Sequence, residues 1–236
     1  MTWSLIARDK GRFGIAVATR AFAVGALCPY VESGVGALAT QALVNPFYGV
    51  EGLALLREGR TAAEVVERLT TADAGREHRQ LHVIDAAGRI AAHTGKDCIA
   101  WCGDLRGEDF SLAGNMLAGA RVLSETAAAW RAKAALPFPR RLIAAMRAGE
   151  AAGGDKRGRQ SAALRICGEE AWPDLDLRVD DHADPLAELE RLEAMSRERF
   201  VHFARYLPSR RDRVGVTDRA VIDAGIAAAV AAETDR

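Results

Sequence analysis

The sequence predicts an α+β protein in which two largely antiparallel β-sheets stack face to face and helices cover their outer faces, a four-layer αββα sandwich. Pairs of β-rich segments alternate along the chain with pairs of amphipathic segments. This order does not suit a parallel βαβ architecture. The 236 residues are 49% apolar and 27% charged, as expected of a soluble globular chain that can bury a large core.

Each element is predicted from its local pattern. The predicted strands are 2–7, 13–18, 35–39, 80–85, 89–93, 160–167 and 175–179, and the predicted helices are 46–56, 62–70, 120–132, 140–148 and 185–206. The first two strands flank a turn at 8–11, and Gly88 ends a second hairpin turn. Pro46 suits the first turn of a helix. Thr61 followed by Glu64 is typical of a capping box.

A glycine-rich loop is predicted around Gly114, Asn115 and Met116, ahead of the helix at 120–132. The chain shows no repeat and no Pro- or Ser-rich linker. We therefore expect one domain over 1–207, followed by a charged, Ala-rich C-terminal extension over 208–236.

The charge balance bears on partners and location. Lys plus Arg and Asp plus Glu both number 32, which gives no reason to expect a nucleic-acid or membrane partner. A net charge of zero leaves a homodimer or larger homo-oligomer open. No signal peptide or membrane span is recognisable, so a cytoplasmic protein with reduced thiols is expected. The four cysteines do not form a zinc-binding pattern, and no metal or other cofactor is expected.

Several stretches of the chain resemble one family. They are 1–9, 22–26, 34–37, 39–42, Asn45-Pro46, 92–95, 114–117 and the distinctive Gly153-Gly154-Asp155-Lys156-Arg157-Gly158-Arg159-Gln160-Ser161-Ala162. Over about residues 1 to 205 the chain resembles DUF1028, a bacterial and archaeal family of unassigned function placed among the Ntn-hydrolase-like folds. The resemblance implies an αββα sandwich and a hydrolase-like scaffold. The opening is also similar, more distantly, to the mature N-terminus of proteasome-like proteases, in which a Thr begins the first strand.

Thr2 is the candidate nucleophile once Met1 is removed. An N-terminal Thr carries its own base, because its α-amino group has a pKa near 8 and is partly neutral at physiological pH. Asn115 resembles the donors that line an oxyanion hole, although Gly-Asn is equally common in turns. Asp155 could hold the Thr2 ammonium group or a substrate amine.

Six further residues are candidates for substrate binding. They are Arg20, Thr40, Gln41, His93, Arg157 and Gln160. Arg157 could hold a carboxylate through its planar guanidinium group, with Arg20 assisting. Thr40 and Gln41 precede a helix N-terminus that can offer backbone N–H groups to an anion, whereas Asn45 is better explained as the cap of that helix. His93 is interpreted as a polar residue at a strand end near the site.

These residues leave three hypotheses open, so whether the protein is an enzyme is not fixed by its sequence. The first is a small-molecule amidohydrolase that cleaves a C–N bond with Thr2. The second is a non-catalytic protein that binds a small ligand or assembles on the same scaffold, since the early strands offer only Lys10, in a turn, where proteasome-like enzymes place a lysine beside the Thr. The third is an unprocessed enzyme with another nucleophile, such as Thr40 or Ser161.

Overall fold

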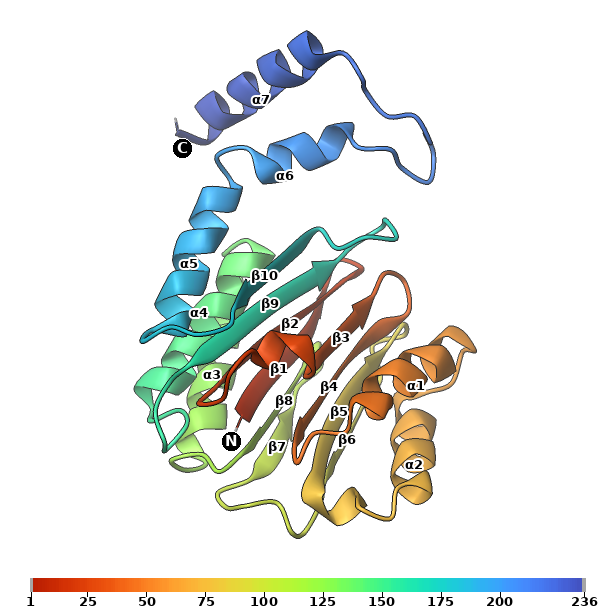
Figure 1. Cartoon of the computed structure of the whole chain (residues 1–236), viewed down its shortest axis with the longest axis vertical. Helices are drawn as coiled ribbons and strands as arrows, with labels where there is room; N and C mark the ends of the chain where they lie inside the picture. Colours follow the sequence, from red (N-terminus) through yellow and green to blue (C-terminus); the bar gives the residue numbers. More distant parts are fainter. Residues whose placement is uncertain (1, 235–236) are drawn as a thin grey trace. The chain divides into compact units, whose positions relative to one another are not determined.

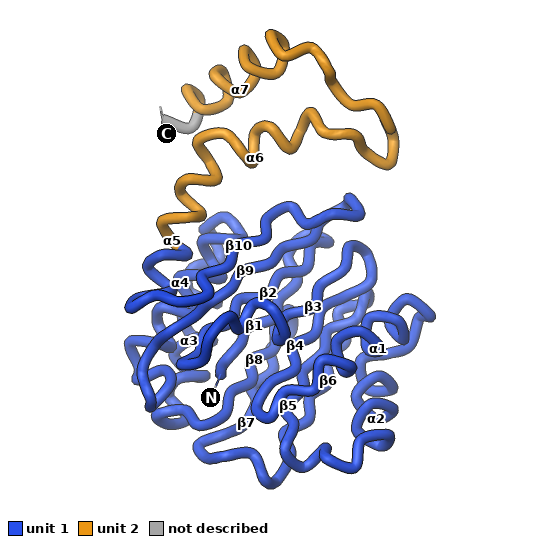
Figure 2. The backbone as a smooth tube through the Cα atoms, in the orientation of Figure 1, with its two compact units in different colours: residues 1–189 blue, residues 190–236 orange. Residues whose placement is uncertain are grey.

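The computed structural model describes residues 2–234. The chain divides into two compact units, residues 1–189 and residues 190–236 (Figure 2). The sequence places the end of the main domain at 207, further along than the first unit extends. No helix among the described residues is both long and apolar enough to cross a bilayer.

Two antiparallel sheets form the centre of the first unit. One has six strands in the order β10-β9-β2-β1-β8-β7 and the other four strands in the order β3-β4-β5-β6. The strands of the first sheet are β1 (Thr2–Asp9), β2 (Arg12–Thr19), β7 (Gly103–Arg106), β8 (Phe110–Asn115), β9 (Ser161–Cys167) and β10 (Leu175–Val179). Those of the second are β3 (Pro29–Glu32), β4 (Gly36–Ala42), β5 (Arg79–Asp85) and β6 (Ile90–Thr94).

Each sheet carries a pair of helices on its outer face, and the inner faces pack together (Figure 1). Helices α3 (Arg121–Ala132) and α4 (Phe138–Ala151) cover the six-stranded sheet, and α1 (Pro46–Arg57) and α2 (Ala62–Ala72) cover the four-stranded sheet. Short 3-10 helices η1 (Val24–Ala26) and η2 (Arg76–His78) lie in the connections. The α+β class and the αββα layering predicted from the sequence are confirmed.

Residues that alternate along the strands divide into an inner and an outer set. On the inner faces, Ile6, Ile15 and Ile84 belong to an apolar cluster between the sheets. On the outer face of the four-stranded sheet, Leu38 and Leu81 pack with the helix residues of a second cluster. The apolar cluster fills only one end of the space between the sheets, and polar side chains occupy the other end.

The helix starts follow the sequence signals. The side chain of Asn45 caps α1 by accepting a hydrogen bond from the Phe47 N–H at 3.1 Å, with Pro46 at the first position. Thr61 and Glu64 form both hydrogen bonds of a capping box at the start of α2. Such caps satisfy backbone N–H groups that have no partner within the helix.

The structure differs from the predicted elements first in its strands. Strands β3, β7 and β8 were not predicted, and β8 includes Gly114 and Asn115 where a loop was expected. This strand escapes simple pattern reading because its inner face carries Ser111, Ala113 and Asn115, which are small or polar yet buried. Only its outer face carries bulky apolar residues, Phe110 and Leu112, and two such residues make too short an alternating pattern to indicate a strand.

The single helix predicted over 185–206 is wrong. The segment forms α5 (Pro185–Ser196), α6 (Phe200–Phe203) and the 3-10 helix η3 (Ala204–Tyr206). The hydroxyl of Ser196 donates to the Glu193 carbonyl at 2.7 Å, and the next N–H groups bond three residues back instead of four. These bonds tighten the last turn and end the helix. The second unit continues to α7 (Arg219–Thr234).

Candidate functional site

Thr2 lies at the polar end of the space between the sheets. It begins β1 and pairs in register with Thr19 of β2 on one side and with Asn115 of β8 on the other. The Thr2 hydroxyl donates a hydrogen bond to the Thr19 hydroxyl at 3.2 Å, and Thr2 is 8% exposed. Met1 lies outside the described residues.

Two buried amide side chains contact the backbone of Thr2, and a third joins them to each other. Nε2 of Gln41 and Nδ2 of Asn115 each approach the Thr2 carbonyl oxygen, at 3.4 and 3.5 Å. The same two nitrogens donate to Oε1 of Gln80, at 2.8 and 3.1 Å. These amides come from both sheets, so the end of β1 is tied to the facing sheet as well as to its neighbours.

A second set of polar side chains lies next to these amides, two residues further along β1, and is joined to them through Gln41. The Ser4 hydroxyl contacts Oε1 of Gln41 at 2.7 Å and Nε2 of His82 at 2.8 Å, and Nδ1 of His82 contacts the Ser111 hydroxyl at 3.1 Å. Burial lowers the pKa of His82 to about 3. The imidazole is therefore neutral near pH 7, as an enclosed ring without a charged partner should be.

The alternation of the strands explains how the chain gathers these groups. Thr2 and Ser4 occupy alternate positions of β1, and Gln80 and His82 alternate positions of β5. In both strands the residues between them are apolar and face the covering helices. The polar residues of the two strands therefore meet between the sheets, at the polar end of the sandwich.

A cavity of about 250 Å³ opens at this end of the sheets. Its walls are Ala42, Leu43, His78, Asp97, Cys98, Ile99, Asn115 and Met116. Two of these residues have left-handed backbone angles, with φ of 71° at Ala42 and 52° at Met116. Non-glycine residues seldom adopt this conformation, and such strain concentrates at functional sites.

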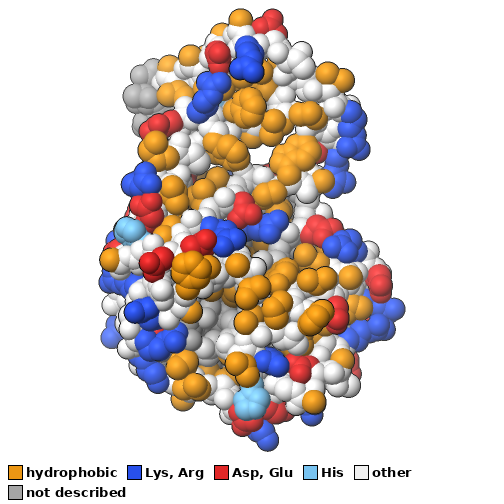
Figure 3. All heavy atoms as spheres, in the orientation of Figure 1, with side chains coloured by type: hydrophobic (Ala, Val, Ile, Leu, Met, Phe, Trp, Pro, Cys, Tyr) orange, Lys and Arg blue, Asp and Glu red, His pale blue; other side chains and the backbone are white. Residues whose placement is uncertain are grey.

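The cavity is mostly apolar, with a polar rim. Leu43 and Ile99 are 63% and 57% exposed, and Figure 3 shows hydrophobic side chains gathered on the viewed face of the first unit. At the rim, Nε2 of His78 lies 3.8 Å from Oδ2 of Asp97, with both side chains about half-exposed. A neutral ligand with an apolar portion suits these walls better than a strongly charged one.

Cys98 lies in this cavity beside a His and an Asp but is poorly suited to act as a nucleophile. Its thiol donates to the Arg79 carbonyl oxygen at 3.3 Å. Burial first, and then the neighbouring Cys102, raise the pKa of Cys98 to about 11. A reactive cysteine needs a lowered pKa. No group of three or more His, Cys, Asp or Glu residues within the described part of the chain could hold a metal ion.

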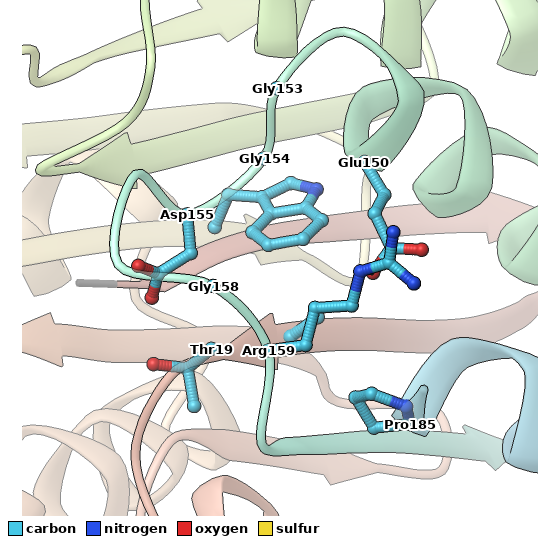
Figure 4. A pocket seen from close by; sticks show the side chains of 10 residues that line it. Thr19, Glu150, Gly153, Gly154, Asp155, Gly158, Arg159 and Pro185 are labelled. Carbon is cyan, nitrogen blue, oxygen red and sulfur yellow. The ribbon is translucent and has the colours of Figure 1, made fainter. Parts of the chain in front are cut away.

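A second cavity of about 280 Å³ lies on the helix-covered face of the six-stranded sheet (Figure 4). It is lined by Trp3, Ala18, Thr19, Glu150, Gly153, Gly154, Asp155, Gly158, Arg159 and Pro185. In Figure 4, Asp155 and Glu150 lie on opposite sides of the cavity, and the Arg159 side chain extends toward Glu150. Burial and Asp184 raise the pKa of Glu150, and Arg159 opposes the shift. Thr19 links the two regions, because it lines this cavity and accepts the hydrogen bond from Thr2.

The glycine-rich segment 153–161 is folded around Asp155. The Asp155 carboxylate accepts hydrogen bonds from the backbone N–H groups of Arg20 at 2.6 Å and Arg157 at 2.8 Å, and from the Arg157 guanidinium at 3.2 Å. Arg20 donates to Oε1 of Gln160 at 2.5 Å. These four predicted site residues are thus one connected group, and the donors around Asp155 already satisfy much of its carboxylate.

The other predicted site residues divide into those that contact Thr2 and those whose side chains bond elsewhere. Gln41 and Asn115 meet at Thr2, as described above. Thr40 faces the covering helices and donates to the Asn45 carbonyl oxygen at 3.2 Å, and His93 contacts the Arg76 carbonyl oxygen at 2.9 Å. Ser161 is fully buried and donates to the Ala21 carbonyl oxygen at 2.6 Å. Alternation explains the separation of Thr40 from Gln41, since adjacent strand residues point to opposite faces.

Sequence reasoning missed several residues of the region. They are Ser4, Thr19, Gln80, His82, Ser111 and, in the second cavity, Trp3 and Glu150. The signal for Gln80 and His82 was present, because polar residues at every second position of an otherwise apolar strand indicate a polar inner face. Thr19 could be found only from the pairing register of the first hairpin.

Comparison with other proteins agrees with this architecture. A crystal structure of a protein from Silicibacter pomeroyi, itself assigned to DUF1028, superimposes with a TM-score of 0.85 at 33% identity, over 92% of this chain and 96% of that one. No curated protein matches the sequence. The profile of DUF1028, described as a family of unknown function, matches residues 2–189. The chain therefore belongs to the DUF1028 family.

Proposed function

We propose that this protein is an N-terminal-nucleophile hydrolase that cleaves C–N bonds in small molecules with Thr2. The observation that carries the proposal is the position of Thr2 at the end of a central strand. There its hydroxyl donates a hydrogen bond to Thr19, and its carbonyl oxygen accepts from Gln41 and Asn115. Burying so many polar groups contributes less stability than an apolar core of the same shape. A site that requires Thr2 in a fixed position gives a reason to retain them.

The chemistry requires a free α-amino group on Thr2, and hence removal of Met1. The Thr2 hydroxyl would attack the carbonyl carbon of the substrate amide while the α-amino group accepts its proton. That proton would pass to the departing amine as the C–N bond breaks, leaving an ester on Thr2. Water would then hydrolyse the ester, with the same amino group as base, and regenerate the hydroxyl.

A second candidate function is binding of a small ligand without turnover. It is favoured by one observation: within residues 2–234 the Thr2 hydroxyl hydrogen-bonds to a neutral hydroxyl and to no Lys, His or carboxylate. Under this alternative the cavity beside Asn115 would hold the ligand, and Thr2 would serve only to order the strand end.

The two functions are separated by substituting Thr2. We expect the natively processed protein to begin at Thr2 by intact mass and to release amine or ammonia from members of a panel of neutral amides, such as N-acetylated amino-acid amides and N-alkyl amides. Thr2→Ala should abolish this release, because alanine lacks the nucleophilic oxygen. The assay measures the released amine together with the N-terminal mass of the active sample.

Thr40→Ala and Ser161→Ala serve as matched controls, because each removes a buried hydroxyl that lies elsewhere in the fold. Both should keep turnover if they fold. Full activity in Thr2→Ala, or in protein that retains Met1, would exclude the proposed mechanism. Ligand binding without turnover in the processed wild type would support the second candidate.

A further inference from the structure

The direction of the hydrogen bonds between the sheets is fixed by backbone carbonyl groups. Nε2 of Gln80 lies 3.1 Å from the Gly103 carbonyl oxygen and 2.9 Å from the Gly114 carbonyl oxygen. Carbonyl oxygens only accept, so the nitrogen of this amide must face them. Oε1 of Gln80 consequently faces the opposite way and can only accept.

The orientation of the Gln80 amide fixes that of the two amides that contact it. Because Oε1 of Gln80 accepts, Gln41 and Asn115 must both present nitrogen to it. The Thr2 carbonyl oxygen imposes the same requirement, since it is approached by the same two nitrogens. Two independent acceptors therefore set the orientation of the Asn115 amide, which removes the usual ambiguity of such groups.

The remaining polar atom of Asn115 is its oxygen. Both hydrogens of Nδ2 are engaged, and among the described residues Oδ1 accepts no hydrogen bond. Asn115 is 1% exposed and lines the 250 Å³ cavity beside Met116 and Ile99. Oδ1 is not among the buried side-chain atoms that lack a partner, so it is accessible from the cavity, and a donor on a ligand that enters the cavity can reach it.

We propose that Oδ1 of Asn115 selects a ligand by accepting a hydrogen bond from an N–H group, in a neutral molecule such as a secondary amide or urea with an apolar substituent. The apolar substituent would lie against Leu43, Ile99 and Met116. This inference rests on the proposed function in that the ligand is taken to be the substrate. It assigns Asn115 a role opposite to the oxyanion donor that its sequence context suggests, because its donors are already committed to Thr2 and Gln80.

The same chain of bonds extends to His82 and gives an independent check. Oε1 of Gln41 can only accept, so the Ser4 hydroxyl donates to it and must accept from His82. His82 then carries its proton on Nε2 and accepts from Ser111 at Nδ1. ¹⁵N NMR of histidine-labelled protein at pH 7 should show the Nε2–H tautomer for this ring, whereas an Nδ1–H tautomer would overturn the assigned direction.

Ligand selection is tested with two amides that differ in one donor. Wild-type protein, uniformly ¹⁵N-labelled, is titrated with N-methylacetamide and with N,N-dimethylacetamide while the backbone signals of the cavity residues are followed. N-methylacetamide should give saturable shifts and bind about fivefold more tightly, the effect of one neutral hydrogen bond. Equal affinity, tighter binding of the dimethyl compound, or no saturable shift from either would overturn the proposal.

Asn115→Leu provides the matched variant and should remove the preference for the N–H compound. The wild-type comparison stands by itself where this variant does not fold. Failure here is distinguishable from failure of the proposed function. Turnover that depends on Thr2 but shows no N–H preference removes only the role of Asn115, whereas an N–H preference without turnover removes only the hydrolase.

Discussion

Replacing Gln80 with methionine is expected to destabilise the protein by about 4 kcal/mol, a large share of the 5–15 kcal/mol that stabilises a typical domain. The substitution keeps the length of the side chain but removes both ends of its amide. The carbonyl groups of Gly103 and Gly114 lose a donor, and the amides of Gln41 and Asn115 lose an acceptor. Each buried polar group left without a partner costs about 1–3 kcal/mol.

Urea unfolding followed by circular dichroism measures this loss. Gln160→Met is the matched control, because it makes the same chemical change at a glutamine whose partners, Arg20 and Asp181, are held near the surface. It should cost less than about 1 kcal/mol. Similar losses for the two variants would show that the amide chain between the sheets contributes little to stability.

Stability should fall as the pH is lowered below the normal pKa of histidine, because His82 is buried in its neutral form. The pKa of His82 is lowered from 6.5 to about 3 in the folded protein, through burial. Between these values the unfolded chain binds a proton that the folded protein does not. The stability that depends on a neutral His82 is therefore fully present above pH 6.5. It is lost as the pH falls toward 3, and the unfolding free energy drops by about 1.4 kcal/mol per pH unit.

This pH effect is isolated by comparing the wild type with His82→Gln. Glutamine is neutral at all these pH values and can still donate to Ser4 and accept from Ser111. Between pH 7.5 and 5.0 the wild type should lose about 2 kcal/mol more unfolding free energy than the variant. Parallel pH profiles would mean that His82 titrates normally in the folded state.

The sequence was sufficient to predict the layers because each outer element carries a strong local signal. The capping box at Thr61 and Glu64 and the Pro after Asn45 mark helix starts by local hydrogen bonding and sterics alone. The first hairpin is predicted equally well by its turn. Elements without such signals were missed: β8 carries bulky apolar residues only at Phe110 and Leu112, and β3 is only four residues long.

The candidate site was predicted only in part for a different physical reason. Thr2, Gln41 and Asn115 were singled out separately, but their meeting depends on which residues pair across strands far apart in sequence. Gln80 connects Gln41 and Asn115, and its alternating strand indicates only that it faces inward, not which residues it meets. Its importance arises from the two backbone carbonyl groups it faces, which only the folded structure brings together.

The orientation of side chains on a strand also separates residues that the sequence groups together. Thr40 and Gln41 are neighbours in the chain, yet one faces the covering helices and the other faces Thr2. In the same way, His93 points to the helix-covered side of its sheet, whereas Thr94 contacts Gln80. A shift of one residue in the assumed register would exchange these roles.

The proposal that Thr2 is a nucleophile is tested most directly by covalent labelling. A β-lactone probe acylates an activated hydroxyl and forms an ester without a leaving group, which adds the full mass of the probe. After digestion and mass spectrometry, the adduct is expected on Thr2 in the peptide that begins the processed chain, and it should be absent from Thr2→Ala. Labelling at another residue, or no labelling of processed wild-type protein, would contradict the assignment of Thr2.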